Sequence, residues 1–230
     1  MIRRILSLTL VICLLAAPVF AKSINIPDLM GDEAFAKAAP EQRLAMLNQQ
    51  IADKKIQSHE VSGDIWARLF MDVLVGVKDP KARIEKYGQL RNQYPKTGTT
   101  YDLETTLCND FLAVAKPKTI LERIKMIQEL SDRKIITWPT VAPLHRGLLS
   151  LHLSTDEKYL ALGGMDKLIY IEKLAKDKYC SNLTTTGFAK GVANEMLSAA
   201  PPDKQGALFA EIVKVTDFFT KSAMERGYIK

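Results

Sequence analysis

Histidine and cysteine are the side chains best suited to metal binding or nucleophilic catalysis, and this 230-residue chain has three of each. His145 and His152 are seven positions apart, so one helix would carry them on the same face but about 10 Å apart along its axis. They therefore cannot ligate the same metal ion. Cys108 is expected inside a helix, whereas a reactive thiolate favours a helix start beside positive charge. We expect no metal site, no cofactor and no catalytic residue among these side chains.

Acidic residues and glycines give no sharper indication of catalysis. The chain has 26 Asp and Glu residues, so carboxylate pairs of the kind that glycoside cleavage requires are unavoidable, and no pair is singled out. Gly163-Gly164 lacks the glycine spacing and the Lys-Ser/Thr ending of a phosphate-binding loop, and it predicts a turn. These residues identify no reaction, and we favour a protein without catalytic activity.

Aromatic and arginine side chains on the second helices of the expected helix pairs, or on the loops that lead into them, are the candidates for binding another protein. Trp, Tyr and Arg dominate the energetically important contacts of protein interfaces. The candidate binding residues are Trp66, Tyr101, Trp138, His145 and Arg146. Packing is the alternative role, because Trp66 lies beside an apolar stripe and Trp138 precedes Pro139 in a loop.

The elements that must position these residues are predicted to be helices. Apolar residues recur with a period of 3.6 along the chain, while the alternation typical of strands never persists. Four prolines stand at expected helix starts, and they are Pro40, Pro80, Pro117 and Pro201. Their spacings are 40, 37 and 84 residues, and the last spacing corresponds to two periods of 42. We predict an all-α fold of about ten helices in antiparallel pairs with a period of about 40 residues, similar to an α-solenoid. A globular helical bundle is the alternative.

Cys108 and Cys180 bear on the choice between these two architectures. A disulfide between them would close a loop of 73 residues, counting both cysteines, and would stabilise the fold by about 4 to 5 kcal/mol. In an open solenoid the second and fourth helix pairs lie on the order of 20 Å apart, whereas a disulfide needs α-carbons within about 7 Å. Free thiols would therefore favour the open solenoid, and a bridge would favour a globular bundle or a tightly curled repeat. Both states of the cysteines are left open.

The first 21 residues are expected to be a cleaved signal peptide. They contain two arginines, an apolar run over residues 5–16, and the small-residue ending Val19-Phe20-Ala21. The run is broken by Pro18 and is shorter than the stretch of about 20 apolar residues that a membrane-spanning helix needs.

Two segments are expected after the signal peptide: an N-terminal lead with a short capping helix over residues 22–39, and a single helical-repeat domain over residues 40–230. No later apolar stretch reaches membrane-spanning length, so the mature protein is predicted to be soluble, not membrane-spanning, and periplasmic or secreted. The net charge of +6, or about +4 without the signal peptide, is too mild and too interspersed for a nucleic-acid partner.

The composition and the repeat lead to one functional hypothesis and two alternatives. With 47% apolar and 25% charged residues, the chain can form a folded core. Stacked helix pairs present extended binding surfaces. We therefore expect an exported, non-enzymatic helical-repeat protein that acts as a protein- or peptide-binding adaptor in the cell envelope, with an envelope or secreted protein as its partner. The alternatives are an envelope hydrolase or lyase that acts on a polymer, and a carrier of an apolar ligand.

Overall fold

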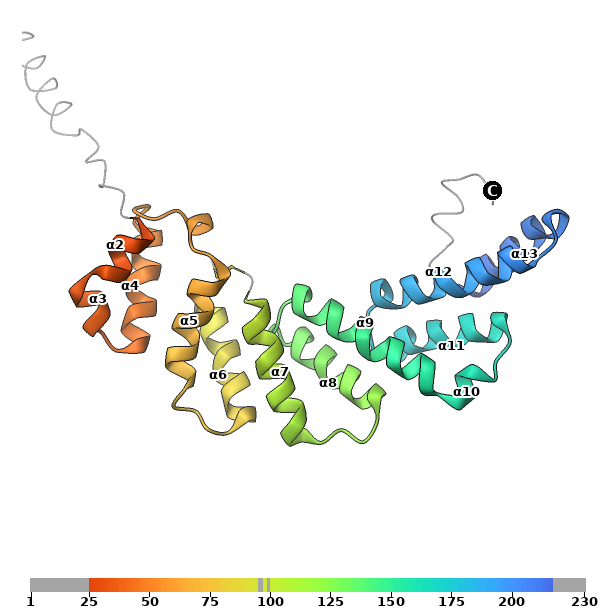
Figure 1. Ribbon diagram of the computed structural model, residues 1–230, viewed down its shortest axis with the longest axis horizontal. Helices are drawn as coiled ribbons and strands as arrows, with labels where there is room; N and C mark the ends of the chain where they lie inside the picture. Colours follow the sequence, from red (N-terminus) through yellow and green to blue (C-terminus); the bar gives the residue numbers. More distant parts are fainter. Residues whose placement is uncertain (1–24, 95–96, 99, 217–230) are drawn as a thin grey trace, which may run out of the picture. The chain divides into compact units, whose positions relative to one another are not determined.

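The computed structural model describes residues 25–94, 97–98 and 100–216 (Figure 1). Across these residues it contains twelve α-helices, one short 3₁₀ helix and no strand, which confirms the predicted all-α fold. None of the described helices is long and apolar enough to cross a lipid bilayer. The expected signal peptide, residues 1–21, lies outside the described residues.

The described residues divide into two compact units. The first unit comprises residues 25–73 with 97–98, and the second comprises residues 74–94 with 100–216. The single domain expected over residues 40–230 therefore contains parts of both units.

Two short α-helices, two longer α-helices and one 3₁₀ helix form the first unit. Its elements are α2 (Ile26–Gly31), α3 (Glu33–Lys37), α4 (Pro40–Ala52), the 3₁₀ helix (Ser58–Glu60) and α5 (Gly63–Leu74). In the described part of the expected lead, residues 25–39, there are two short helices, and Asp32 separates them. The Asp32 carboxylate caps α3 by accepting the Phe35 N–H at 2.9 Å. Arg43 of α4 and Asp72 of α5 form an ion pair at 3.0 Å, which joins the two longer helices.

Three helix pairs, one short helix between the second and third pairs, and a final helix form the second unit. Its helices are α6 (Pro80–Gln93), α7 (Tyr101–Ala115), α8 (Ile120–Asp132), α9 (Trp138–Thr155), α10 (Glu157–Leu160), α11 (Gly164–Lys176), α12 (Asn182–Ala199) and α13 (Pro202–Val215). Helix α6 pairs with α7, α8 with α9, and α11 with α12 (Figure 1). Helix α9 also contacts α7 and α12, so the second helices of successive pairs lie next to one another. This succession of helix pairs is consistent with the solenoid-like prediction and equally with its alternative, a globular helical bundle.

Short sequence signals set the helix starts of the second unit. Asp79 caps α6 through its carboxylate, and Pro80 stands at the first position of the helix, as predicted. Pro117 does not open α8, contrary to expectation, because the helix begins three residues later. The Thr119 hydroxyl accepts the Glu122 N–H at 3.1 Å and caps the helix there. A threonine cap, rather than the proline, therefore sets this boundary.

The first helices of the four pairs begin at residues 40, 80, 120 and 164, close to the predicted period. Three of them end in the same turn, in which a lysine adopts the left-handed conformation with φ of 58°. These lysines are Lys54, Lys134 and Lys178. The residues ten and seven positions before each lysine are buried, and so is the second residue after it. Helix α6 differs, because Tyr94 ends it directly before Pro95, a residue that cannot follow a helical one without strain.

The second helices of the pairs share a burial pattern when they are counted from their N-caps. The caps in the second unit are Thr100, Thr137 and Ser181. The fourth, eighth and twelfth residues after each cap are buried, and they are Glu104, Cys108 and Leu112 in α7, Val141, His145 and Leu149 in α9, and Thr185, Ala189 and Ala193 in α12. Counting from Ser62 in the first unit gives Trp66, Phe70 and Leu74, which are also buried. Glu104 and His145 therefore place ionisable side chains at core positions of the repeat.

Candidate functional site

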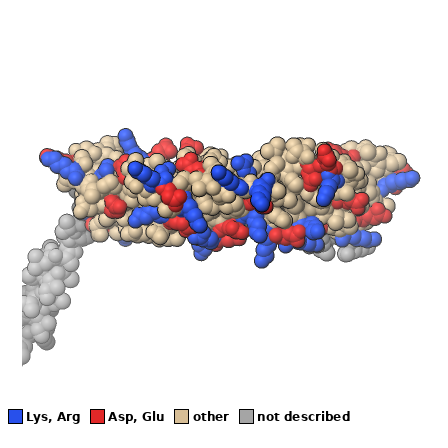
Figure 2. Space-filling view, turned by 90° about the horizontal axis from the view of Figure 1, so that it is seen from below, with Lys and Arg blue, Asp and Glu red and all other residues tan. Residues whose placement is uncertain are grey.

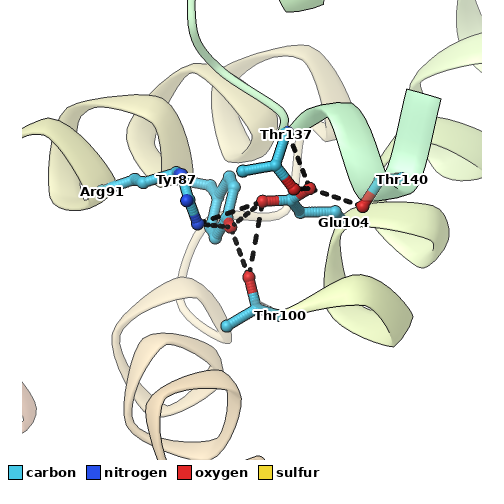
Figure 3. Close-up of polar contacts among 6 residues, drawn as sticks. All are labelled: Tyr87, Arg91, Thr100, Glu104, Thr137 and Thr140. Atoms are coloured by element: carbon cyan, nitrogen blue, oxygen red, sulfur yellow. Dashed lines mark hydrogen bonds and ion pairs between the residues drawn. The ribbon is translucent and has the colours of Figure 1, made fainter. Parts of the chain in front are cut away.

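Glu104 is wholly buried in α7, and both of its carboxylate oxygens accept hydrogen bonds (Figure 3). Oε1 accepts from the Tyr87 hydroxyl at 2.7 Å and from Arg91 Nη1 at 3.2 Å. Oε2 accepts from the Thr137 backbone N–H at 2.8 Å, and from the hydroxyls of Thr137 and Thr140 at 2.6 Å each. The Thr100 hydroxyl also donates to Oε1, at 3.5 Å. A buried carboxylate is costly unless it is paired and hydrogen-bonded, and here one guanidinium and five neutral donors share its charge.

The Glu104 cluster consists of Glu104 with Tyr87, Arg91, Thr100, Thr137 and Thr140, and it joins α6, α7 and the start of α9. The Tyr87 and Thr100 hydroxyls lie 2.6 Å apart. Burial, and then the nearby Glu104 carboxylate, raises the pKa of Tyr87, so its hydroxyl keeps the proton that it donates. Tyr87 is therefore a neutral hydrogen-bond donor to the buried carboxylate.

A close approach of the Ile135 side chain to the backbone of α6 at Gly88 accompanies the meeting of Thr137 and Glu104. The turn between α8 and α9 lies against α6, and a Cβ added at Gly88 would be only 2.9 Å from Ile135 Cγ1. Only glycine fits at position 88 without displacing that isoleucine. The buried side chains of Ile135 and Ile136 hold the turn, and Thr137 follows them directly.

A pocket of about 510 Å³ lies beside this cluster, where α6 ends and α9 begins. We call it the Trp138 pocket, and it is lined by Arg91, Asn92, Tyr94, Ser131, Lys134, Ile136, Thr137, Trp138 and Pro139. Arg91 and Thr137 belong both to the Glu104 cluster and to the pocket wall. The buried carboxylate therefore fixes two residues of an open pocket.

The charged residues that line the Trp138 pocket, Arg91 and Lys134, are both basic. Elsewhere the surface has a mixed character, and Figure 2 shows Lys and Arg interspersed with Asp and Glu on one face of the described residues. The pocket thus combines two cations with an exposed aromatic ring, because the Trp138 side chain is 38% exposed. This combination can bind a segment that carries both an anionic group and a flat or apolar part.

Burial separates the candidate binding residues into two groups. Trp66 and His145 are both 0% exposed, so neither offers a contact surface in this structure. The Trp66 ring lies 5.8 Å from the Phe70 ring between centroids. His145 Nε2 lies 3.1 Å from the Ile124 carbonyl oxygen, and burial lowers the pKa of His145 to about 4, so its ring is neutral. Both act as packing residues, the alternative role considered for the aromatic candidates.

Tyr101, Trp138 and Arg146 are the exposed candidates. Tyr101 and Trp138 occupy equivalent positions, because each directly follows the N-cap of the second helix of its pair. Both rings are partly exposed, 40% for Tyr101 and 38% for Trp138. Arg146 lies in the middle of α9 and does not line the pocket. The structure therefore places two of the five candidates at the same edge of the second unit and one of them, Trp138, in a pocket.

Cys108 and Cys180 are free and buried thiols in this structure. Burial raises the pKa of each to about 12, and for Cys108 the Glu104 carboxylate adds to the effect. Both thiols are therefore protonated at neutral pH and poor nucleophiles.

Four residues of the Glu104 cluster and the Trp138 pocket were not among the binding residues expected from the sequence. They are Tyr87, Arg91, Glu104 and Lys134. An alignment of the helix pairs could have found the first and third, because Tyr87 stands where the other first helices have Leu47, Ile127 and Ile171. Glu104 likewise stands where the other second helices have Trp66, Val141 and Thr185. No such signal distinguishes Arg91 or Lys134 from other surface cations.

A second polar cluster lies at the other end of α9. The Tyr170 hydroxyl donates to Asp156 Oδ2 at 2.6 Å, and His152 Nε2 lies 2.8 Å from the same hydroxyl. Because the hydroxyl has one proton and gives it to Asp156, His152 donates its Nε2–H to the tyrosine oxygen. The Tyr170 hydrogen bond lowers the pKa of Asp156, and burial lowers that of His152. No group of three or more His, Cys, Asp or Glu among the described residues is arranged to hold a metal ion.

No family model, no curated protein and no solved structure matches this chain.

Proposed function

We propose that this chain is a helical-repeat protein that binds a peptide or an extended protein segment through the Trp138 pocket. The observation that carries the proposal is the pocket itself, an opening of about 510 Å³ with an exposed tryptophan at the edge where the second helices begin. Trp138 and Arg91 belong to the residue types that dominate protein-binding contacts. A location in the cell envelope, where an adaptor role is expected, depends on the predicted signal peptide.

The rigid support of the pocket favours recognition of a partner. Arg91 and Thr137 are held by a carboxylate that is 0% exposed and accepts hydrogen bonds from α6, from the start of α9 and from the N-cap of α7. A wall fixed in this way loses little conformational entropy when a ligand binds. Pre-organised walls and exposed aromatic anchors are typical of binding sites.

The chemistry of the pocket supports binding more than the two alternative functions. A hydrolase or lyase needs an acid or base that reaches its substrate, and Glu104 is buried with both oxygens occupied. Within the part of the chain that the structure describes, the residues that line the pocket include no His, Asp or Glu. A carrier of apolar ligands needs an enclosed apolar cavity, whereas this pocket contains two cations and several hydroxyl and amide groups.

Site-specific crosslinking in the native envelope tests the proposal. A photoreactive phenylalanine analogue is incorporated at Trp138, and at Leu151 as the matched control, since Leu151 is exposed on the same helix but lies outside the pocket. We expect one adduct of defined mass at position 138 that is missing at position 151. The same adducts at both positions, or none at position 138, would overturn the proposal.

The expected export is tested in the same cells. Intact-mass measurement of the purified protein is expected to give a chain that begins at Lys22, recovered from the envelope fraction. A chain that retains residues 1–21 in the cytoplasm would remove the envelope part of the proposal and leave the binding part standing.

A further inference from the structure

We infer that the Trp138 pocket binds a carboxylate group of the partner segment, held between Arg91 and Lys134. This inference rests on the proposed function and specifies the chemistry of its ligand. The two cations belong to different elements, since Arg91 lies in α6 and Lys134 in the turn between α8 and α9. An anion in the pocket would thus be approached from two sides.

Arg91 retains donors for a ligand while Glu104 positions it. Its contacts with Glu104 at 3.2 Å and with the Tyr87 hydroxyl at 3.5 Å both use Nη1. The Nη2 and Nε groups of the guanidinium take no part in these contacts, and the side chain is 20% exposed. Arginine presents a planar fork of donors that matches the geometry of a carboxylate, so a second carboxylate can bind beside Glu104.

Lys134 supplies the second positive charge from a fixed backbone position. Its own N–H donates to the Ser131 carbonyl oxygen at 2.8 Å within the left-handed turn. The neighbouring Arg133 points its charge elsewhere, because its Nη2 pairs with Glu85 at 2.6 Å. Of these two consecutive cations, Lys134 is therefore the one that lines the pocket.

The remaining lining residues suit the chain around such a carboxylate. The Thr137 N–H and hydroxyl are both committed to Glu104. Asn92 and Ser131 are among the residues that supply neutral hydrogen-bonding groups to the wall, and Trp138 supplies a flat surface for an adjacent side chain. The carboxylate can be the C-terminus of the partner or an acidic side chain, and the chemistry of recognition is the same for both.

Three related peptides test the inference on the full chain. The first is an acetylated and amidated hexapeptide of alternating Glu and Ala; the second replaces every Glu with Gln; the third is the Gln peptide with a free C-terminal carboxylate. Binding is followed by tryptophan fluorescence, because Trp138 lines the pocket and the other tryptophan, Trp66, is 0% exposed. Trp138→Phe controls for the origin of the signal.

We expect at least one carboxylate-bearing peptide to bind about tenfold more tightly than the neutral amidated peptide. A gain confined to the Glu peptide assigns an acidic side chain, and a gain confined to the free C-terminus assigns a terminal carboxylate. Lys134→Gln is expected to reduce that gain about threefold, because Arg91 still binds the carboxylate. Lys178→Gln is the matched control, because Lys178 has the same turn and the same φ but lies outside the pocket, and it is expected to change nothing.

Two outcomes would overturn the inference. One is equal affinity for all three peptides, and the other is the same effect of Lys134→Gln and Lys178→Gln. If crosslinking at position 138 gives its adduct in either case, the proposed function stands and only the carboxylate assignment fails. Absence of both crosslinking and peptide binding would overturn the proposed function itself.

Discussion

Helix α9 is held at each end by a carboxylate, and the two ends differ in burial. At its N-terminus Glu104 of α7 accepts from Thr137 and Thr140 and is 0% exposed. At its C-terminus Asp156 accepts from Tyr170 of α11, and its side chain is 17% exposed. Both carboxylates receive a tyrosine hydroxyl, at 2.7 Å and 2.6 Å. These two tyrosine-to-carboxylate hydrogen bonds are nearly equal in length, so their geometry alone does not distinguish the two ends of α9.

The two ends of α9 differ in the access of solvent to the carboxylate and in the helix dipole that acts on it. Water can replace a lost partner of Asp156, whereas a lost partner of Glu104 leaves a buried group unsatisfied. Glu104 also lies at the positive N-terminal end of α9, where an anion is stabilised. Asp156 follows the negative C-terminal end of α9 and finds its favourable dipole in α10, which it caps through the Lys158 N–H at 3.0 Å. We therefore expect equal changes at the two ends to have unequal effects on stability.

Neutralising Glu104 and Asp156 in turn tests this comparison, and it is expected to give the largest difference in the free energy of unfolding. Glu104→Gln adds donors to a site already filled with donors and leaves Arg91 partly buried without its anion, so we expect a loss of about 3 to 5 kcal/mol of unfolding free energy. Asp156→Asn keeps a capping side chain and a solvated site, so we expect a loss below about 1 kcal/mol. Urea denaturation followed by circular dichroism measures both.

Glu129→Gln is the matched control for Glu104→Gln, because it makes the same change at an exposed position in α8. Its expected effect is within about 0.5 kcal/mol. Equal losses for Glu104→Gln and Asp156→Asn would show that burial does not distinguish the two ends.

Two histidines of α9, one near its middle and one near its C-terminus, allow the same comparison for the pH dependence of stability. His145 is 0% exposed, and burial lowers its pKa from 6.5 to about 4. The unfolded chain therefore takes up a proton below pH 6.5 that the folded chain refuses, so stability that is complete above pH 6.5 is lost as the pH falls toward 4. From about pH 7.5 to about pH 5 we expect His145 to account for a loss of about 2 kcal/mol.

The same measurement on the variants separates the two histidines. His145→Gln keeps a polar group near the Ile124 carbonyl without a titrating ring, so its stability is expected to fall less over this pH range. His152 has the same direction of pKa shift, but Asp156 opposes it, and we expect His152→Gln to change the pH dependence less. A larger change for His152→Gln than for His145→Gln would contradict the role of burial.

Local signals in the sequence predict the helices and their period, because caps and apolar stripes act over a few residues. Asp79 and Pro80 mark the start of α6 within two positions. Pro117 shows the limit of such signals, since a competing cap at Thr119 determines where α8 begins. The period of the chain therefore follows from its sequence more closely than any single boundary does.

The candidate site depends on contacts that local patterns do not contain. Glu104 meets Tyr87 and Thr137 across 17 and 33 positions of the chain. Trp66 and Trp138 are the same residue type near helix starts, yet one is fully buried and the other is 38% exposed. The difference is one of position in the pair, because Trp66 is the fourth residue after its cap and Trp138 is the first. This difference in position becomes visible only when the helix pairs are aligned with one another at their caps.

Removing one hydroxyl at each end of α9 gives the smallest and most closely matched comparison. Tyr87→Phe and Tyr170→Phe delete the same atom, and each deleted hydroxyl donates to a carboxylate. At Glu104 the loss leaves a buried anion short of one donor, and we expect about 1.5 kcal/mol of destabilisation. At Asp156 water can take the place of the hydroxyl, and we expect about 0.5 kcal/mol or less.

A double-mutant cycle of Tyr87→Phe with Glu104→Gln is expected to show coupling, because the two side chains share a hydrogen bond. Equal losses for the two tyrosines, or a cycle without coupling, would mean that packing rather than the buried carboxylate fixes the start of α9 and the wall of the Trp138 pocket.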